Sequence, residues 1–277
     1  MTRPHLHSRH THGGLLSLDR YAQASRLSMV SPRLKAAFAV AVLLLCVAAD
    51  SAAIGLVISA GMLAACIGCS GAPVRYILSL MAIPVAFILI SCLAVIFDFS
   101  AAPLGFWDLP LPGALWLSAT RAGLRAAGLL FFKAYGAVSC LYFLSLTTPM
   151  QELIEVLRAA HIPAICIELM YLIYRYLFLL LDMQNHLTIA ARSRLGYADR
   201  RRAFYTFPRI SGSVLAGAFR RSGICFDAME ARCYDGSLRF LTRHAPVRAR
   251  HAAVCALIFF ALAALAACIK YKGVDLF

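Results

Sequence analysis

The sequence has 277 residues, of which 61% are hydrophobic and only 14% are charged. A soluble domain is usually ~45–50% apolar and ~25% charged, so this composition, with its long apolar blocks, indicates a membrane protein. Lys and Arg total 27 against 13 Asp and Glu, which gives a net charge of +14. No DNA- or RNA-binding pattern accompanies this charge. We therefore assign it to membrane orientation and anionic lipid headgroups, and expect no nucleic-acid partner.

Residues 1–35 form a polar, basic segment that we interpret as a cytoplasmic tail, because its apolar content starts too late for a signal peptide. Imidazole binds cobalt, nickel and zinc, so the histidines of this tail are weak candidate metal ligands. The plainer interpretation, which we favour, is a disordered tail with incidental histidines. The histidines in question are His5, His7, His10 and His12.

Five apolar runs predict transmembrane helices. A bilayer requires about 20 residues, so the first run must gain length from its flanks. Residues 36–147 are then an N-terminal membrane region with about four spans, and residues 251–277 carry a C-terminal span. The runs are 36–49, 52–69, 77–97, 128–146 and 252–269.

Between these spans, residues 98–113 predict a loop and residues 114–147 a long helical stretch that starts at the membrane interface. Residues 148–250 predict a cytoplasmic region that opens with a short amphipathic helix, MQELIEVLRAA. The following helix, from Pro163, is apolar as far as Leu181. This leaves open whether residues 163–182 are embedded in the membrane, and the number of spans is uncertain by one.

Three charged residues recur at intervals of seven on that helix: Glu168, Arg175 and Asp182. The spacing places them on one helix face, with a drift of about 20° per heptad. Charges that face lipid are costly, so these should face protein or water. We interpret them as a structural, buried polar network, with a transport path as the alternative.

The positive charge is distributed unevenly between the two sides of the predicted membrane. With the N-terminus inside, five spans place 22 of the 27 Lys and Arg on the cytoplasmic side. This bias is the one expected of a multi-pass protein whose N-terminus is cytoplasmic. The sequence therefore predicts an all-α integral membrane protein with about five transmembrane helices and additional amphipathic cytoplasmic helices.

Two segments of the cytoplasmic region resemble each other. Each is a helix-compatible run that reaches Ala-Arg, continues with a small residue and is soon followed by Gly. Arg at a helix end is favoured by the helix dipole, so a capping role is the simpler interpretation. Two such ends 40 residues apart suggest instead that Arg binds carboxylates of a partner. The residues are Ala191, Arg192, Ser193 and Arg194 in the first segment, and Ala231, Arg232 and Cys233 in the second.

With these segments in view, the chain resembles the transmembrane (T) component of energy-coupling factor transporters, in the CbiQ-type cobalt/nickel subgroup. Ala231-Arg232-Cys233 matches the second Ala-Arg motif of the family, although Cys233 stands where the family usually has Gly. For the first motif we choose Ala191-Arg192-Ser193, with Arg194 or a shifted alignment as the alternative. Further resemblance is carried by Ser31-Pro32-Arg33-Leu34-Lys35, Thr147-Thr148-Pro149, Leu157-Arg158, Ile162-Pro163 and Tyr174-Arg175-Tyr176.

The resemblance implies a non-catalytic coupling subunit in the plasma membrane of a prokaryote. Its coupling helices would bind two ATP-binding cassette ATPase subunits. It would also hold a membrane-embedded substrate-binding (S) subunit, with a small accessory membrane subunit as a further partner. ATP-driven motion would pass through the helices to the S subunit, and the cargo would be cobalt or nickel. No cofactor is implied.

Two alternatives remain open at this stage. A T component for a vitamin such as biotin would carry the same motifs, because they do not contact the cargo. An intramembrane enzyme could use Glu168, Asp182 and His186 as an acid–base cluster, but no nucleophile or metal motif completes such a site. The sequence also contains no G-x-x-x-x-G-K-[ST] motif, so ATP hydrolysis is expected in partner subunits.

Overall fold

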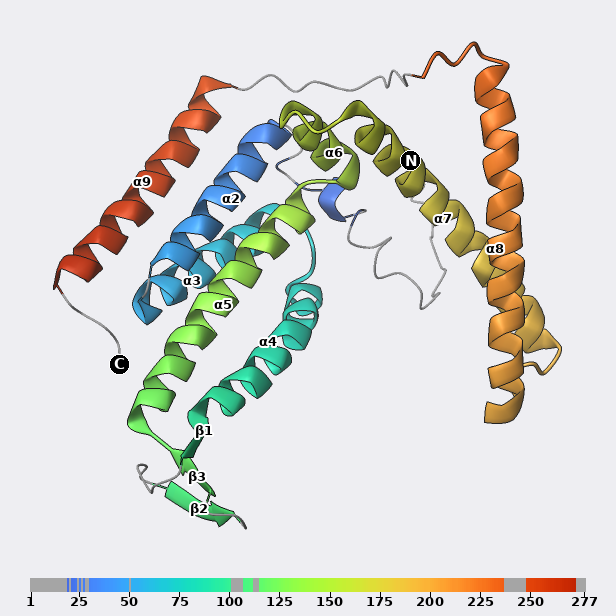
Figure 1. The fold of residues 1–277 in the computed structure, drawn as a ribbon. Coiled ribbons are helices and arrows are strands. Elements are labelled where there is room, and N and C mark those ends of the chain that lie inside the picture. The colour runs from blue at the N-terminus through green and yellow to red at the C-terminus, as the bar shows by residue number, and fades with distance from the viewer. Residues whose placement is uncertain are drawn as a thin grey trace, which may run out of the picture. The chain divides into compact units, whose positions relative to one another are not determined.

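We analysed a computed structural model of the chain. It describes residues 30–49, 51–100, 107–111, 115–236 and 248–272, together with single positions and one short piece between 19 and 27. The chain divides into two compact units. One comprises residues 1–153 and 244–277, and the other comprises residues 154–243. The elements, in chain order (Figure 1), are α2 (Pro32–Ala48), α3 (Ala52–Cys69), α4 (Val74–Ile96), β1 (Phe97–Ser100), β2 (Trp107–Leu111), β3 (Leu115–Ala119), α5 (Arg121–Thr147), α6 (Met150–Ala159), α7 (Ala164–Ser193), α8 (Arg200–Glu230) and α9 (Ala249–Lys272).

Among the residues that the structure describes, five helices are long and apolar enough to cross a membrane: α3, α4, α5, α7 and α9. The predicted class of all-α integral membrane protein is therefore confirmed, and so is the number of about five. One member of the set differs from the prediction. The run 36–49 belongs to α2, which has 17 residues, and the long helix α7 takes its place in the set.

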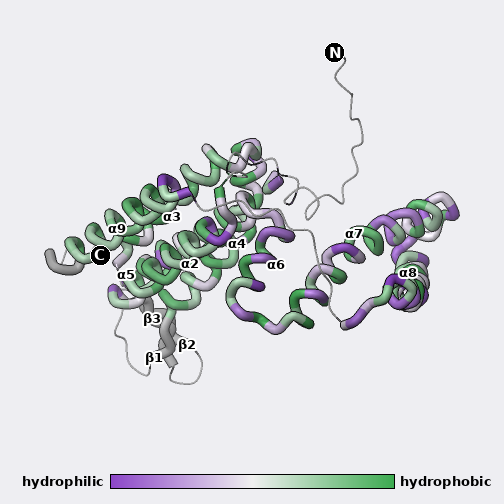
Figure 2. Tube along the Cα trace, turned by 90° about the horizontal axis from the view of Figure 1, so that it is seen from above, coloured by the Kyte–Doolittle hydropathy of each residue, from purple (hydrophilic) through white to green (hydrophobic). Residues whose placement is uncertain are grey.

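The first unit is a bundle in which α5 packs against α2, α3 and α4, and α9 against α2 and α3. Its main core cluster is buried and drawn from three helices, with Val42 on α2, Ile58 on α3 and Phe143 on α5. Figure 2 shows hydrophobic residues dominating α2, α3 and α9, whereas hydrophilic residues recur along α8. Apolar surface on the outside of such a bundle is the arrangement expected of helices surrounded by lipid.

Small residues let α3 and α5 approach closely. A Cβ on Gly55 of α3 would lie 2.7 Å from the carbonyl oxygen of Phe132, and a Cβ on Gly136 of α5 would lie 3.2 Å from the carbonyl oxygen of Gly55. Contacts of this kind between glycines and a neighbouring backbone are a common means of helix association in membranes. The contact therefore fixes the spacing of α3 and α5.

A small sheet corrects the prediction for residues 98–119. β3 lies between β1 and β2 and pairs antiparallel with both, so that Ala119 is opposite Phe97 on one side and Trp107 on the other. The predicted loop over 98–113 and the predicted helical start at 114 are therefore wrong, and α5 begins at Arg121. Proline is usually unfavourable in a strand, but Pro110 lies in β2, an edge strand, where a missing N–H is tolerated.

Candidate functional site at two matching helix ends

The second unit is built on an antiparallel pair of long helices, α7 and α8. Near the start of α8, the Thr206 hydroxyl donates to the Gly196 carbonyl just past the end of α7, at 2.9 Å. After α8 has ended, the Tyr234 hydroxyl donates to the Glu168 carboxylate near the start of α7, at 3.1 Å. Between these two points, a Cβ on Gly217 would collide with a side chain of α7. The C-terminal ends of α7 and α8 thus lie at opposite ends of the pair.

The C-terminal end of α7 closes in a Schellman motif. The Gly196 N–H donates to the Ala191 carbonyl at 2.8 Å, and the Leu195 N–H donates to the Arg192 carbonyl at 3.0 Å. Leu195 has φ +58°, in the left-handed region that glycine usually occupies at this position. Arg194 directly precedes this left-handed residue.

The end of α8 closes in the same way. The Tyr234 N–H donates to the Met229 carbonyl at 3.1 Å, and the Cys233 N–H donates to the Glu230 carbonyl at 2.9 Å. Cys233 has φ +59°. The resemblance to the family implies Gly at this position. A left-handed conformation favours Gly, because glycine has no Cβ to strain. Arg232 directly precedes this left-handed residue.

Matching the two caps residue by residue identifies the counterpart of Arg232. Leu195 and Cys233 are the left-handed residues, so Arg194 and Arg232 occupy the same cap position, one residue earlier. The sequence-based choice was Arg192, with Arg194 as the alternative. Arg192 instead lies in the last turn of α7 and accepts the cap hydrogen bond through its carbonyl. The three arginine side chains are all exposed.

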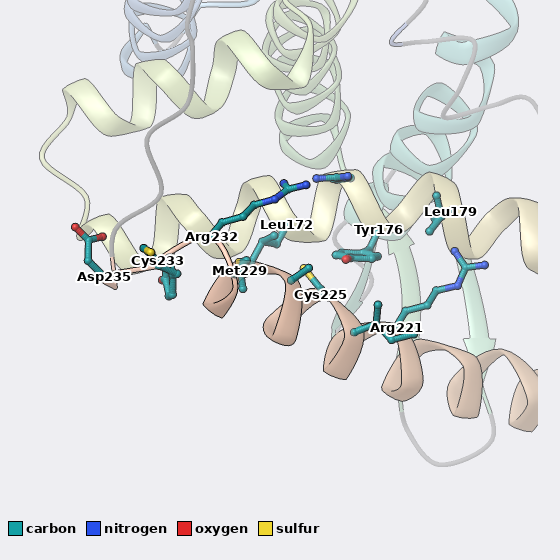
Figure 3. Close-up of a pocket in the computed structure, with 13 residues that line it drawn as sticks. Leu172, Tyr176, Leu179, Arg221, Cys225, Met229, Arg232, Cys233 and Asp235 are labelled. Atoms are coloured by element: carbon teal, nitrogen blue, oxygen red, sulfur yellow. The ribbon is translucent and has the colours of Figure 1, made fainter.

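A pocket of about 640 Å³ lies between α7 and α8, next to the second of these ends. Three of the residues that line it are arginines, Arg175 from α7, Arg221 from α8 and Arg232 from the cap. Figure 3 shows Arg232 extending from the end of α8 toward α7. Asp235 also lines the pocket, so the lining carries an excess of positive charge. Such a groove attracts carboxylate groups.

The predicted polar network on α7 has its members in different surroundings. Glu168 is 6% exposed. It accepts the hydrogen bond of Tyr234, and this bond to a carboxylate raises the pKa of the tyrosine. Arg175 and Asp182 are both exposed, as is His186 from the alternative acid–base cluster. Of the three residues predicted to form the network, only Glu168 is therefore buried within this chain.

Metal-binding residues were predicted only weakly. The candidates His5, His7, His10 and His12 lie outside the residues that the structure describes. Within the described part of the chain, no group of three or more His, Cys, Asp or Glu side chains is placed to hold a metal ion.

A buried lysine was not predicted. Lys35 on α2 is 3% exposed, and its Nζ lies 3.2 Å from Glu152 Oε2 at the start of α6. The same Nζ donates to the Thr147 carbonyl at the end of α5, at 3.0 Å. The hydroxyl of Ser25 also donates to that carbonyl, at 3.3 Å. Lys35 therefore fixes the corner where α5 gives way to α6.

Comparison with known proteins extends this picture. The family model described as "Cobalt transport protein", CbiQ, matches residues 23–242. A protein of uncharacterised function from Methanocaldococcus jannaschii is 28% identical over 81% of this chain and 82% of its own length. The cobalt transport protein CbiQ of Salmonella typhimurium is 29% identical over 56% of this chain and 69% of its own. A putative fused cobalt transport protein, CbiMQ, from Methanocorpusculum labreanum is 29% identical over 80% of this chain and 37% of its own.

The matched region includes both helix ends and every predicted membrane helix except the last. It covers far more than half of the chain, and two of the three relatives are named as cobalt transport proteins. The resemblance inferred from the sequence motifs is thereby confirmed. This chain is a multi-pass membrane protein that belongs to the CbiQ family of cobalt transport proteins.

Proposed function

We propose that the chain is the transmembrane coupling subunit of an ATP-driven importer of the energy-coupling factor type. It would link two ATPase subunits to a membrane-embedded substrate-binding subunit. The observation that carries the proposal is the pair of matching Schellman caps, which present Arg194 and Arg232 at opposite ends of the α7–α8 pair. The chain itself would carry out no catalysis.

The separation of the two ends favours two binding partners rather than one. α7 has 30 residues, and a helix rises 1.5 Å per residue, so the ends lie roughly 45 Å apart. One small domain spans about 30 Å. Two ATPase subunits, each bound at one helix end, fit this separation better than a single subunit that reaches both.

Arginine suits this role for a chemical reason. Its planar guanidinium forms two parallel hydrogen bonds to a carboxylate and keeps its charge at any physiological pH. Both Arg194 and Arg232 are exposed at the end of a rigid helix. A partner groove with acidic residues would hold each end firmly enough to transmit a displacement along the helix.

The apolar surface of α8 supports a further contact, with the substrate-binding subunit. Large aromatic side chains on this helix are exposed, including Phe204 at 80% and Phe219 at 72%. Exposed apolar surface of this extent marks an interface with protein or lipid. One relative is described as a fused cobalt transport protein, in which the part similar to this chain is joined to a further segment. A lasting contact with a second transport subunit agrees with that arrangement. A small accessory membrane subunit remains a further proposed partner.

The proposed topology places residues 1–35 and the α6–α8 region in the cytoplasm. α7 is apolar enough to be counted among the candidate spans. However, it pairs along its length with α8, an arginine-rich helix outside that set. We therefore place α7 with α8 as a coupling helix, its apolar face toward partner subunits or headgroups. The fifth crossing is then α2, whose 17 residues are at the lower limit of length for a transmembrane helix. The N-terminus would be cytoplasmic, in accordance with the positive-inside rule.

The cargo is proposed to be cobalt, because the matched family and the named relatives are cobalt transport proteins. The same coupling machinery would also serve nickel or a vitamin as cargo. Uptake of radioactive cobalt, with unlabelled nickel and biotin as competitors, distinguishes these cargoes. Uptake of radioactive biotin without any uptake of cobalt would assign the vitamin function.

The coupling role is tested by charge reversal at both caps. Replacing Arg194 and Arg232 with Glu should abolish co-purification of the ATPase subunits and cobalt uptake, while the chain still inserts into the membrane. The matched control reverses two exposed arginines elsewhere on α8, Arg201→Glu with Arg209→Glu. Normal uptake in the Arg194→Glu/Arg232→Glu variant would contradict the coupling assignment.

The same experiment separates the two candidates for the first motif. The single variant Arg194→Glu should weaken ATPase association more than Arg192→Glu, because only Arg194 shares the cap position of Arg232. The reverse order would restore the first sequence-based choice, Arg192.

A further inference from the structure

A second groove lies in the first unit, between its membrane helices. It has a volume of about 630 Å³ and is lined by α9 on one side and by α2 and α3 on the other. Val57 and Gly61 of α3 line it together with Ile258 and Leu262 of α9. These positions are apolar, and a Cβ added to Gly61 would meet no atom within 4 Å. The groove therefore has open space in its wall at this point.

One end of the groove is basic. Arg250 and His251, at the start of α9, line it, as does Lys35 at the start of α2. Lys35 is already paired with Glu152. Arg250 is exposed and His251 is half-buried. A mobile anion that reached this end would therefore meet a guanidinium for which the described residues provide no ion pair, with an imidazole beside it.

The dimensions of the groove match half of a bilayer. Arg250 and Leu262 are 12 residues apart on α9, which corresponds to about 18 Å at 1.5 Å per residue. Half of the hydrocarbon core is about 15 Å thick. The groove thus runs from the level of the headgroups to the middle of the membrane, along one leaflet.

We propose that this groove is a binding site for an anionic phospholipid, with one acyl chain between α9 and the α2–α3 pair and the phosphate at Arg250 and His251. Basic pockets between transmembrane helices on the cytoplasmic side favour anionic headgroups. A helix of a partner subunit suits the groove less well, because the guanidinium of Arg250 and the imidazole of His251 at one end favour an anion. Such a partner would use the outer face of α9, where Leu257 is 72% exposed.

The site is tested on the full chain, purified in detergent, delipidated, and examined by native mass spectrometry. Phosphatidylglycerol is added in parallel with phosphatidylcholine of the same acyl chains. Phosphatidylglycerol should bind with an affinity about fivefold higher, the factor that corresponds to ~1 kcal/mol for one basic residue at the membrane surface. Arg250→Gln should remove that preference, whereas Arg248→Gln, which changes an exposed arginine outside the groove lining, should keep it.

The acyl-chain part of the site has its own matched pair of variants. Gly61→Leu should fill the groove and reduce binding of both lipids at least tenfold. Gly68→Leu is its control, because Gly68 is on the same helix, also has no atom within 4 Å of an added Cβ, and does not line the groove. Both variants should unfold at the temperature of the unmodified chain in lipid-free detergent, which separates lost binding from lost folding.

Equal binding of the two lipids would overturn the headgroup assignment, and unchanged binding in Gly61→Leu would overturn the site. A phospholipid with a photo-reactive acyl chain provides an independent readout. Its cross-links should map to α9 around Ile258 and to α3 around Met62, both in the isolated chain and in the assembled transporter. Loss of these cross-links on assembly would assign the groove to a partner subunit instead.

Discussion

The two units of this chain differ in how completely they bury their own apolar side chains. In the first unit, α3 and α5 approach so closely that a Cβ on Gly55 would lie 2.7 Å from a backbone oxygen. Core residues such as Ile58 and Val42 are almost fully buried there. In α8 of the second unit, all of whose residues the structure describes, no side chain is buried. Phe204 and Phe219 are instead exposed.

This difference indicates what each unit requires from its surroundings. The first unit is held by helix–helix contacts within the chain and needs only lipid outside it. The second unit leaves large aromatic side chains exposed, which is unfavourable for a helix pair surrounded by water alone. We infer that the second unit is completed by partner subunits, and that substitutions in the two units should fail in different ways: in folding for the first unit and in assembly for the second.

The largest effect on stability is expected from Gly55→Leu. The added side chain collides with the Phe132 backbone, which cannot rotate away, so α3 and α5 must separate. We expect a loss of about 3 kcal/mol or more in the free energy of unfolding, at the upper end of the range for overpacked sites. Thermal unfolding in detergent measures this loss. Gly68→Leu, on the same helix in open space, should unfold like the unmodified chain, and an equally stable Gly55→Leu would contradict the close contact.

The next effect is expected from Lys35→Met, which removes one partner of a buried ion pair. Breaking a buried pair typically costs 3–5 kcal/mol. The Glu152 side chain is 30% exposed, so water still solvates part of its charge. We therefore expect the free energy of unfolding to fall by about 2 kcal/mol. Denaturant unfolding checks this value. The double variant Lys35→Met/Glu152→Met should recover part of the loss, and additivity of the two single effects would show that the pair is not coupled.

A smaller effect of opposite sign is expected from Cys233→Gly. A side chain in the left-handed region costs roughly 1–2 kcal/mol, which glycine avoids, although glycine loses more backbone entropy on folding. The net gain should be about 0.5–1 kcal/mol, observed as slower amide hydrogen exchange at the C-terminal turn of α8. Cys233→Ala keeps the Cβ and should show no gain. An equal gain in Cys233→Ala would mean that the sulfur, not the backbone conformation, is unfavourable.

The smallest effect on folding is expected from Phe219→Ser in α8. An exposed side chain contributes little to the free energy of unfolding, so the change should be within about 0.5 kcal/mol. Assembly should nevertheless suffer, and pull-down of the membrane partner subunit measures this loss. A folding defect as large as that of Lys35→Met would mean that the Phe219 side chain packs against its own chain.

Most of the helical architecture follows from local sequence patterns. The apolar runs locate α3, α4, α5 and α9, and the amphipathic pattern locates α6, because each depends on residues close together in the chain. Strand pairing in β1–β3 does not follow from local pattern, since a proline in an edge strand resembles a loop.

The candidate site was predictable only in part. The sequence locates both arginine segments. It cannot decide between Arg192 and Arg194, because that decision depends on which residue adopts the left-handed conformation. The ion pair of Lys35 with Glu152 joins residues 117 positions apart, a distance over which sequence periodicity carries no information.

The central claim is that the two ends of the α7–α8 pair bind two different ATPase molecules. It is tested most directly by a photo-crosslinking amino acid in place of Leu195, of Cys233, or of both, in the assembled transporter. These positions directly follow the two cap arginines and are exposed. Each single variant should yield an adduct of the chain with one ATPase molecule, and the double variant an adduct with two, resolved by mass. A double variant that reaches only one ATPase molecule, or adducts with the membrane partner alone, would contradict the account.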